Sequence, residues 1–238
     1  MTASTKNLKI ATLNFWGGPW PFTIHKRARF KKLINIIKKE KFDVLALQEV
    51  FMNSDYKKLA SIFKNKYYFY KKKSFILNSS GLVIMSKFPL FNEKYIPLNK
   101  QYFLAKGVLQ ASIKINNRIF EFTNLHLTYC PSYEVCKEEY SRLMSVITSS
   151  NSIVMGDFNI NFPEFHLPKG YKFLSDPANI TLEIKNHYST AGSNKMHQPE
   201  LTIDFIISNA NLKVISTKTD NQNIVSDHYL VSSTIALE

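Results

Sequence analysis

The sequence has few cysteines, few glycines and no long apolar run, and each shortage excludes a class of protein. Two cysteines, Cys130 and Cys136, are too few for a disulfide framework or a cysteine-ligated zinc site, and we expect free thiols. Seven glycines among 238 residues exclude a collagen-like chain. No apolar run approaches the roughly 18 residues of a membrane span, which excludes an integral membrane protein. Residues 1–9 are polar and predict no secretory signal, so the cellular location stays open.

The length and composition indicate one globular domain. A chain of 238 residues buries enough surface for a core without metal or disulfide staples. The composition is 45% hydrophobic, 13% aromatic and 21% charged, as in globular proteins. The chain contains no internal repeat, low-complexity tract or Pro/Gly-rich linker. We therefore expect residues 1–238 to form a single domain, and a monomer.

The basic residues are concentrated in the first third of the chain. The net charge is +13, and residues 1–73 hold 17 Lys and Arg against 4 Asp and Glu, whereas residues 74–238 hold 14 of each. This asymmetry predicts an anionic partner, either nucleic acid or an acidic membrane surface. Four of the 31 basic residues are Arg, the side chain preferred for bidentate phosphate and base contacts. The base composition of the genome is the alternative explanation for the excess of Lys.

Short apolar runs and helical periods predict a layered α/β (α+β) fold. Residues 26–40 form the clearest helix, because Phe30 and Leu33 share one face while most other positions are Lys. Weaker helical periods cover residues 54–64 and 134–149. The expected strands are Leu8–Leu13, Val44–Leu47, Gly81–Met85, Gly107–Ile115, Arg118–Leu125, Ile153–Met155, Leu201–Ile207 and Tyr229–Ala236. Asn116-Asn117 between two of them predicts a hairpin turn, since Asn tolerates positive φ.

Four acidic residues stand in apolar surroundings at or near the ends of expected strands. They are Glu49, Asp157, Asp204 and Asp227. A desolvated carboxylate is costly unless it is paired, hydrogen-bonded or bound to a metal, so the four together predict one shared cation or polar site. Taken singly, each is also explained as a turn cap or a partner of Lys. Carboxylate and Asn oxygens without thiolates suit Mg²⁺ or Mn²⁺, and such an ion with His as acid or base serves phosphoester hydrolysis.

Six short segments carry most of these polar residues. They are Thr12-Leu13-Asn14, Leu47-Gln48-Glu49-Val50, Asn124-Leu125-His126-Leu127, Gly156-Asp157-Phe158-Asn159, Thr202-Ile203-Asp204-Phe205 and Ser226-Asp227-His228. In this order they resemble the endonuclease/exonuclease/phosphatase superfamily, whose archetype is deoxyribonuclease I. The resemblance extends from residue 12 to residue 228 and implies a four-layer α/β/β/α sandwich, with two central sheets and helices outside.

The resemblance also implies a metal site and a water-activating carboxylate. Glu49 would be the principal ligand of the divalent cation, with Asn14 beside it, and Asp227 would bind the metal or fix the site. Asp157 would position or deprotonate the attacking water, and Asn159 would hold a phosphate oxygen.

Two histidines complete the site that the resemblance implies. Asp204 would orient His228 through a ring N–H, and His228 would transfer a proton or stabilise the charge of the phosphorane. His126 matches the second histidine of the deoxyribonuclease and sphingomyelinase branches, where it serves the leaving oxygen as acid. These branches divide the acid and base roles differently, so the division between His126 and His228 stays open.

Further segments are similar to neutral sphingomyelinases within this superfamily. They are Asn14-Phe15-Trp16-Gly17, Lys26-Arg27-Ala28-Arg29, Phe42-Asp43-Val44, Ser80 to Pro89 and Phe103 to Val108. The lysine of the last segment touches the phosphate region in that branch. Lys106 is therefore a candidate phosphate contact, and an ordinary strand-edge lysine is the alternative. The chain departs from this branch at His126-Leu127-Thr128, where a longer polar continuation is usual, so the substrate headgroup stays open.

Both tryptophans, Trp16 and Trp20, fall in the segment 16–22, which directly follows Asn14. Trp beside Pro and Gly suits insertion into a membrane interface or stacking on a substrate. Together with the basic N-terminal third, such a loop would seat the protein on an anionic bilayer. Stacking on a nucleic-acid base and simple packing of the loop are the alternatives.

Three functions follow from these observations. The leading hypothesis is a Mg²⁺-dependent, sphingomyelinase-like phosphodiesterase that releases the phosphorylated headgroup of a phospholipid by in-line water attack. The second is a Mg²⁺-dependent nuclease or DNA-end-processing phosphodiesterase, which the net charge of +13 favours and the scarcity of Arg disfavours. The third is an inactive binding module on the same fold, but every motif position that such a copy can lose is filled here.

Overall fold

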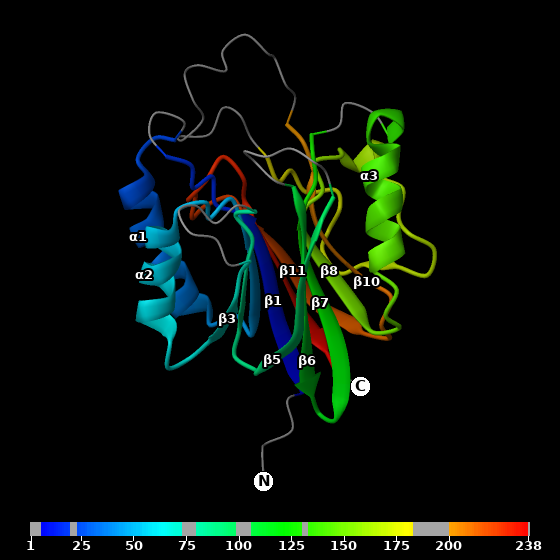
Figure 1. Ribbon diagram of the computed structural model, residues 1–238, viewed down its shortest axis with the longest axis horizontal. Helices are drawn as coiled ribbons and strands as arrows, with labels where there is room; N and C mark the ends of the chain where they lie inside the picture. The colour runs from blue at the N-terminus through cyan, green and yellow to red at the C-terminus, as the bar shows by residue number, and fades with distance from the viewer. Residues whose placement is uncertain are drawn as a thin grey trace.

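The structure is a computed structural model that describes residues 6–19, 23–72, 80–98, 106–129, 133–182 and 200–237. Two six-stranded β-sheets pack face to face. Helices α1 (Lys26–Glu40) and α2 (Asn53–Phe63) lie on one outer side, and α3 (Tyr133–Val146) lies on the other (Figure 1). The expected four-layer α/β/β/α sandwich is thereby confirmed.

Each sheet mixes parallel and antiparallel neighbours. The first sheet has the order β11 (Lys213–Asp220), β12 (Leu230–Ala236), β1 (Asn7–Asn14), β2 (Val44–Gln48), β4 (Val83–Ser86), β3 (Tyr68–Tyr70). The second sheet has the order β5 (Leu90–Pro97), β6 (Gly107–Ile115), β7 (Arg118–His126), β8 (Ser152–Asp157), β10 (Asp204–Ser208), β9 (Lys172–Phe173). A short 3₁₀ helix covers Phe162–Glu164.

Three apolar cores separate the four layers. One lies between the sheets, one between the first sheet and helices α1 and α2, and one between the second sheet and α3. Strand β2 contributes side chains to two of these cores, since Val44 and Ala46 face the other sheet while Leu45 and Leu47 face the helices. Successive strand residues point to opposite faces, so a strand buried on both faces reads as a continuous apolar run.

Most of the expected elements are confirmed. Helix α1 covers the expected residues 26–40, and Asn116 and Asn117 both have positive φ, 48° and 63°, in the hairpin turn between β6 and β7. The outermost strands of the two sheets, β3, β5, β9 and β11, were not predicted from the sequence. An edge strand is covered on fewer sides, so its residues are less apolar; in β11, Lys213 to Thr219 are all exposed or half-buried.

The prediction of free thiols is wrong for Cys136, which is disulfide-bonded. The cysteine count limits how many disulfides a chain can form, but it does not decide whether one forms. Cys130 lies outside the described residues. Among the helices of the described ranges, none is both long enough and apolar enough to span a bilayer.

Candidate active site

Strand direction brings the predicted site residues to one end of the sandwich. Strands β1 and β2 run parallel in the first sheet, and β7 and β8 run parallel in the second. The chain leaves these strands at the polar residues Asn14, Glu49, His126 and Asp157. Residues that end parallel strands meet at the same edge of a sheet, and each sheet contributes two of the four here.

Glu49 follows β2 in a left-handed conformation, with φ 58°. Two glycines allow neighbouring loops to approach it: a Cβ on Gly17 would lie 2.4 Å from the Glu49 carbonyl oxygen, and one on Gly81 would lie 2.9 Å from its Cα. The Glu49 side chain is 20% exposed, and the Asn14 amide donates to its Oε1 at 3.3 Å. The carboxylate is thus held in place while part of it still faces solvent.

Strand register places His126, Asp157 and Asp204 in one row across the second sheet. His126 pairs with Asp157 between β7 and β8, and Asp157 pairs with Asp204 between β8 and β10. His126 Nε2 lies 3.3 Å from Asp157 Oδ2 and 3.8 Å from Glu49 Oε1. All three residues of the row are at most 2% exposed, so their charges act in a site of low dielectric constant.

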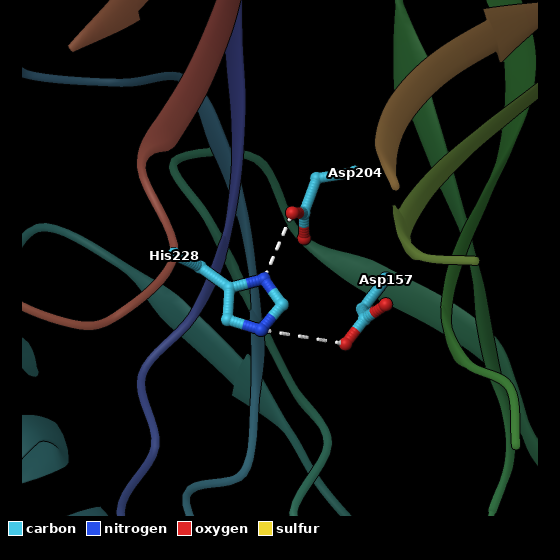
Figure 2. Close-up of side chains that lie close together, drawn as sticks. All are labelled: Asp157, Asp204 and His228. Carbon is cyan, nitrogen blue, oxygen red and sulfur yellow. Dashed lines mark hydrogen bonds and ion pairs between the residues drawn. The ribbon is translucent and has the colours of Figure 1, made fainter. Parts of the chain in front are cut away.

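The imidazole of His228 lies between two carboxylates (Figure 2). Its Nδ1 donates to Asp204 Oδ2 at 2.8 Å, and its Nε2 lies 3.9 Å from Asp157 Oδ2. Burial lowers the pKa of His228, but Asp204, Asp157 and Asp227 outweigh burial and raise the pKa to about 10. The Asp204 contact fixes the ring so that Nε2 faces Asp157.

Asp157 accepts hydrogen bonds from several directions. The Asn14 amide donates to Oδ2 at 3.0 Å, and the Asn159 backbone N–H donates to Oδ1 at 2.9 Å. Burial raises the pKa of Asp157, but His126 and His228 outweigh burial and hold the pKa well below its usual value. This carboxylate is therefore ionised over the whole neutral range.

Lys106 immediately precedes β6 and joins the site. Its Nζ contacts His126 Nε2, and one of the two nitrogens carries the hydrogen that they share. Burial lowers the pKa of Lys106, and the carboxylates of Asp157 and Glu49 partly offset that effect. Lys106 thus places a cationic group beside His126 and the buried Asp157, where it would attract a phosphate.

The remaining predicted residues border this centre. The Asn159 side chain donates to the Leu127 carbonyl at 2.8 Å, and the backbone of Asn159 is left-handed with φ 51°. Asp227 is half-buried beside His228, and its Oδ1 accepts a hydrogen bond from the Ser226 hydroxyl at 2.9 Å. Trp16 is half-buried, its backbone N–H donates to Asn14 Oδ1 at 3.0 Å, and Trp20 lies outside the described residues.

Arg29, a fully buried residue of α1, has a structural role that was not predicted from its place in the segment 26–29. Its guanidinium donates to four backbone carbonyls and one hydroxyl: Phe15 O, Val225 O, Ile24 O, Trp16 O and Thr23 Oγ1. It also lies 4.9 Å from the centroid of the Trp16 ring. Arg29 therefore ties the loop after Asn14 to the segment before Asp227, and Trp16 packs against it, which favours the packing alternative for this loop. Helical spacing indicates that Arg29 shares the buried face of Leu33, four residues later, but it does not indicate which groups the guanidinium binds.

A second missed feature joins the two sheets beneath the site. Gln48 Nε2 donates to Asn124 Oδ1 at 2.7 Å, and Asn124 Nδ2 donates to the Leu47 and Val83 carbonyls, each at 2.9 Å. Both side chains are completely buried. At the start of β10, the Thr181 hydroxyl oxygen accepts hydrogen bonds from the backbone N–H groups of Ile203 and Asp204. Such buried polar contacts fix the spacing of the sheets, and hence of the residues at their ends.

The donor atoms suit a hard divalent cation. Ligand atoms of Asp157, Asp204 and His228 lie within 4.8 Å of one another and form a possible metal group. In this structure the same atoms also form the His228–Asp204 hydrogen bond. Glu49 supplies a third carboxylate nearby and Asn14 an amide, and the two are joined by their own hydrogen bond. Oxygen atoms dominate the centre, as they do in sites for Mg²⁺ or Mn²⁺.

Comparison with known proteins finds similar sequences and similar folds. A Drosophila melanogaster protein named "Putative neutral sphingomyelinase" is 24% identical over 147 residues, which is 56% of this chain and 32% of that protein. Among solved structures, an endonuclease/exonuclease/phosphatase family protein of Leptotrichia buccalis has a TM-score of 0.73 at 21% identity, covering 97% of this chain and 100% of that one. D. rerio TDP2, solved with a single-strand DNA product, has a TM-score of 0.74 at 17% identity, covering 98% and 100%.

The two solved structures establish the fold, and the family is established by the sequence itself. Residues 11–228 match the Endonuclease/Exonuclease/phosphatase family, a range that contains all of the predicted catalytic and metal-binding residues. The chain belongs to the endonuclease/exonuclease/phosphatase family.

Proposed function

We propose that the protein is a Mg²⁺-dependent, sphingomyelinase-like phosphodiesterase, which hydrolyses a phospholipid and releases its phosphorylated headgroup. One observation carries the reaction class: Asp157 Oδ2 lies within 4 Å of His126, His228 and Asn14, with the Asp204 carboxylate behind His228. This arrangement provides a fixed anion for a water molecule and two imidazoles for proton transfer.

The proposal assigns the cation to Glu49 and Asn14, with Asp227 at the edge of the site. Glu49 is the carboxylate of the centre whose side chain remains 20% exposed, which leaves it open to an ion and a substrate. When bound, Mg²⁺ or Mn²⁺ would neutralise phosphate oxygens and so favour attack on phosphorus.

The side chains perform the remaining steps. Asp157, kept ionised, accepts a hydrogen bond from the attacking water and directs its oxygen toward phosphorus. His228, held by Asp204, moves a proton or stabilises the charge that develops on the phosphoryl oxygens. As the bond between phosphorus and the lipid oxygen breaks, His126 supplies a proton to the leaving oxygen, and Lys106 and Asn159 hold non-bridging phosphate oxygens.

Two candidate substrate classes follow from the similarity of this chain to known proteins. The sphingomyelinase name of the Drosophila relative, the sphingomyelinase-like segments and the scarcity of Arg favour a phospholipid. The likeness to a TDP2 structure with a DNA product and the net charge of +13 favour a Mg²⁺-dependent nuclease or DNA-end-processing phosphodiesterase as the alternative. We rank the phospholipid first.

Hydrolysis of sphingomyelin vesicles in ¹⁸O-labelled water tests the reaction. We expect Mg²⁺-dependent release of phosphocholine that carries the label on phosphorus, and loss of release in EDTA. Glu49→Gln should require a higher Mg²⁺ concentration for half-maximal rate, because it removes the charge of the proposed ligand but little volume. Label in the lipid alcohol, or release that persists in EDTA, would contradict the proposal.

A further inference from the structure

The two outer helical layers differ sharply in surface charge. The layer formed by α1 and α2 and the residues that follow them carries ten exposed cations and no exposed acid between residues 23 and 72. They are Arg27, Lys31, Lys32, Lys38, Lys39, Lys41, Lys57, Lys58, Lys64 and Lys66, here called the cationic face. Helix α3, in the opposite layer, exposes Lys137 and Arg142 against Glu134 and Glu138. A genome-wide preference for Lys would act on both layers, so it does not explain the difference.

Three of the four acidic residues between residues 23 and 72 form ion pairs with lysines outside the cationic face. Glu40 pairs with Lys9, Asp43 with Lys87, and Asp55 with Lys26 at 3.2 Å. Glu49, the remaining acid between residues 23 and 72, belongs to the active site. One half-buried carboxylate, Glu40, lines a pocket with Lys32 and Lys39 of the cationic face, and no fully exposed acid lies among its cations between residues 23 and 72.

Lys38 and Lys39, in the last turn of α1, favour the helix, but the placement of Arg27 and Lys31 opposes helix stability. The first turn of α1 contains no acid, its N-cap His25 makes no side-chain capping bond, and Arg27 stands where the helix dipole disfavours a positive charge. Arg27 and Lys31 are also four residues apart, a spacing at which like charges repel. A stability requirement does not account for Arg27 and Lys31, whereas an anionic partner would relieve both effects.

The cationic face begins beside the active site. Helix α1 starts where Arg29 binds the carbonyls of Phe15 and Trp16, directly after Asn14, and α2 starts at Asn53, four residues after Glu49. The two helices lie side by side on the outside of the first sheet (Figure 1). A partner that covers the beginning of both helices therefore lies next to the site.

We infer that the cationic face docks on an anionic phospholipid bilayer and presents the site to lipid headgroups. The inference rests on the proposed function and names the surface on which that function operates. A bilayer fits better than nucleic acid for two reasons. The cations cover one outer layer and do not continue onto α3 across the site, as a strand crossing the site would require. Ile62 and Tyr68, 39% and 51% exposed, lie within four residues of Lys64 and Lys66 along the chain, and such apolar side chains suit a lipid interface.

Two variants with equal loss of charge test the inference. Lys31, Lys38, Lys57 and Lys64 are changed to Gln in the face variant, and the exposed Lys94, Lys114, Lys169 and Lys213 are changed to Gln in the control. Binding is measured by sedimentation with phosphatidylcholine vesicles, with and without 30% phosphatidylserine. We expect the face variant to bind the anionic vesicles at least about tenfold more weakly, and the control to match the wild type. Turnover of a soluble phosphodiester should be unchanged in both.

Equal weakening of vesicle binding in both variants would overturn the inference, because net charge rather than position would then govern binding. Weaker binding to single-stranded DNA with unchanged vesicle binding would overturn it in favour of nucleic acid. Position-dependent vesicle binding in a protein that hydrolyses no phospholipid would support the surface and contradict the proposed function. Phospholipid hydrolysis with vesicle binding equal in all three proteins would support the function and refute the surface.

Discussion

At the scale of single residues, pairing between strands explains why the polar side chains meet. Asp157 and Asp204 are direct partners between antiparallel strands, and His126 and Gly107 are partners one strand further on, so Lys106 arrives beside His126. The sequence placed these residues at strand ends, and the structure confirms that placement. It could not predict the row itself, because the register of two strands depends on residues throughout both of them.

Replacement of Asp157 by Asn tests the water-directing role. Asn preserves volume but removes the charge, and it cannot accept every hydrogen bond that Asn14 and the Asn159 backbone now donate. We expect turnover to fall at least about 10²-fold while the circular dichroism spectrum stays unchanged. Wild-type turnover in a folded Asp157→Asn protein would remove Asp157 from the reaction.

The pH dependence of stability tests the His228–Asp204 pair. The folded-state pKa of His228 is raised from 6.5 to about 10, so its stabilisation is complete below pH 6.5 and is lost as the pH rises toward 10. In EDTA, we expect the unfolding free energy of the wild type to fall over this range by at least about 1 kcal/mol more than that of His228→Gln. Gln can still donate to Asp204 but does not titrate. Parallel curves for the two proteins would show that His228 is not paired as described.

At the scale of elements, the loop after β1 depends on helix α1, which begins twelve residues after that strand ends. Arg29 satisfies carbonyls from three segments, and all of its donor groups are used within the protein. The apolar period of residues 26–40 predicted α1 correctly, but it gave no sign that a buried cation would face backbone carbonyls. Only the folded chain brings those carbonyls together.

Replacement of Arg29 by Met should loosen this loop. The variant removes the guanidinium donors of the Phe15 and Val225 carbonyls, while the Trp16 carbonyl keeps the Thr23 hydroxyl, so we expect the unfolding free energy to fall by at least about 2 kcal/mol. Arg27→Met, on the exposed side of the same helix, should change it by less than about 0.5 kcal/mol. Equal unfolding free energies for the two variants would refute the role of Arg29.

At the scale of the whole molecule, the sequence predicted the layers because the motifs of the family keep their order from residue 12 to residue 228. It also located the basic excess in the first third of the chain. It could not show that these cations occupy one outer layer, because that requires knowing which helices share a side of the sandwich. The fold itself does not select the substrate, since a solved structure with this fold holds a DNA product.

A comparison of substrates in one Mg²⁺ buffer tests most directly whether the protein is a phospholipid phosphodiesterase. Sphingomyelin vesicles, single-stranded DNA and double-stranded DNA are incubated with the wild type and with His228→Ala, and phosphorylated headgroup and DNA fragments are quantified. We expect headgroup release by the wild type, at least about 10² times less by the variant, and no DNA cleavage above that of the variant. DNA cleavage by the wild type without headgroup release would contradict a phospholipid phosphodiesterase and identify a nuclease.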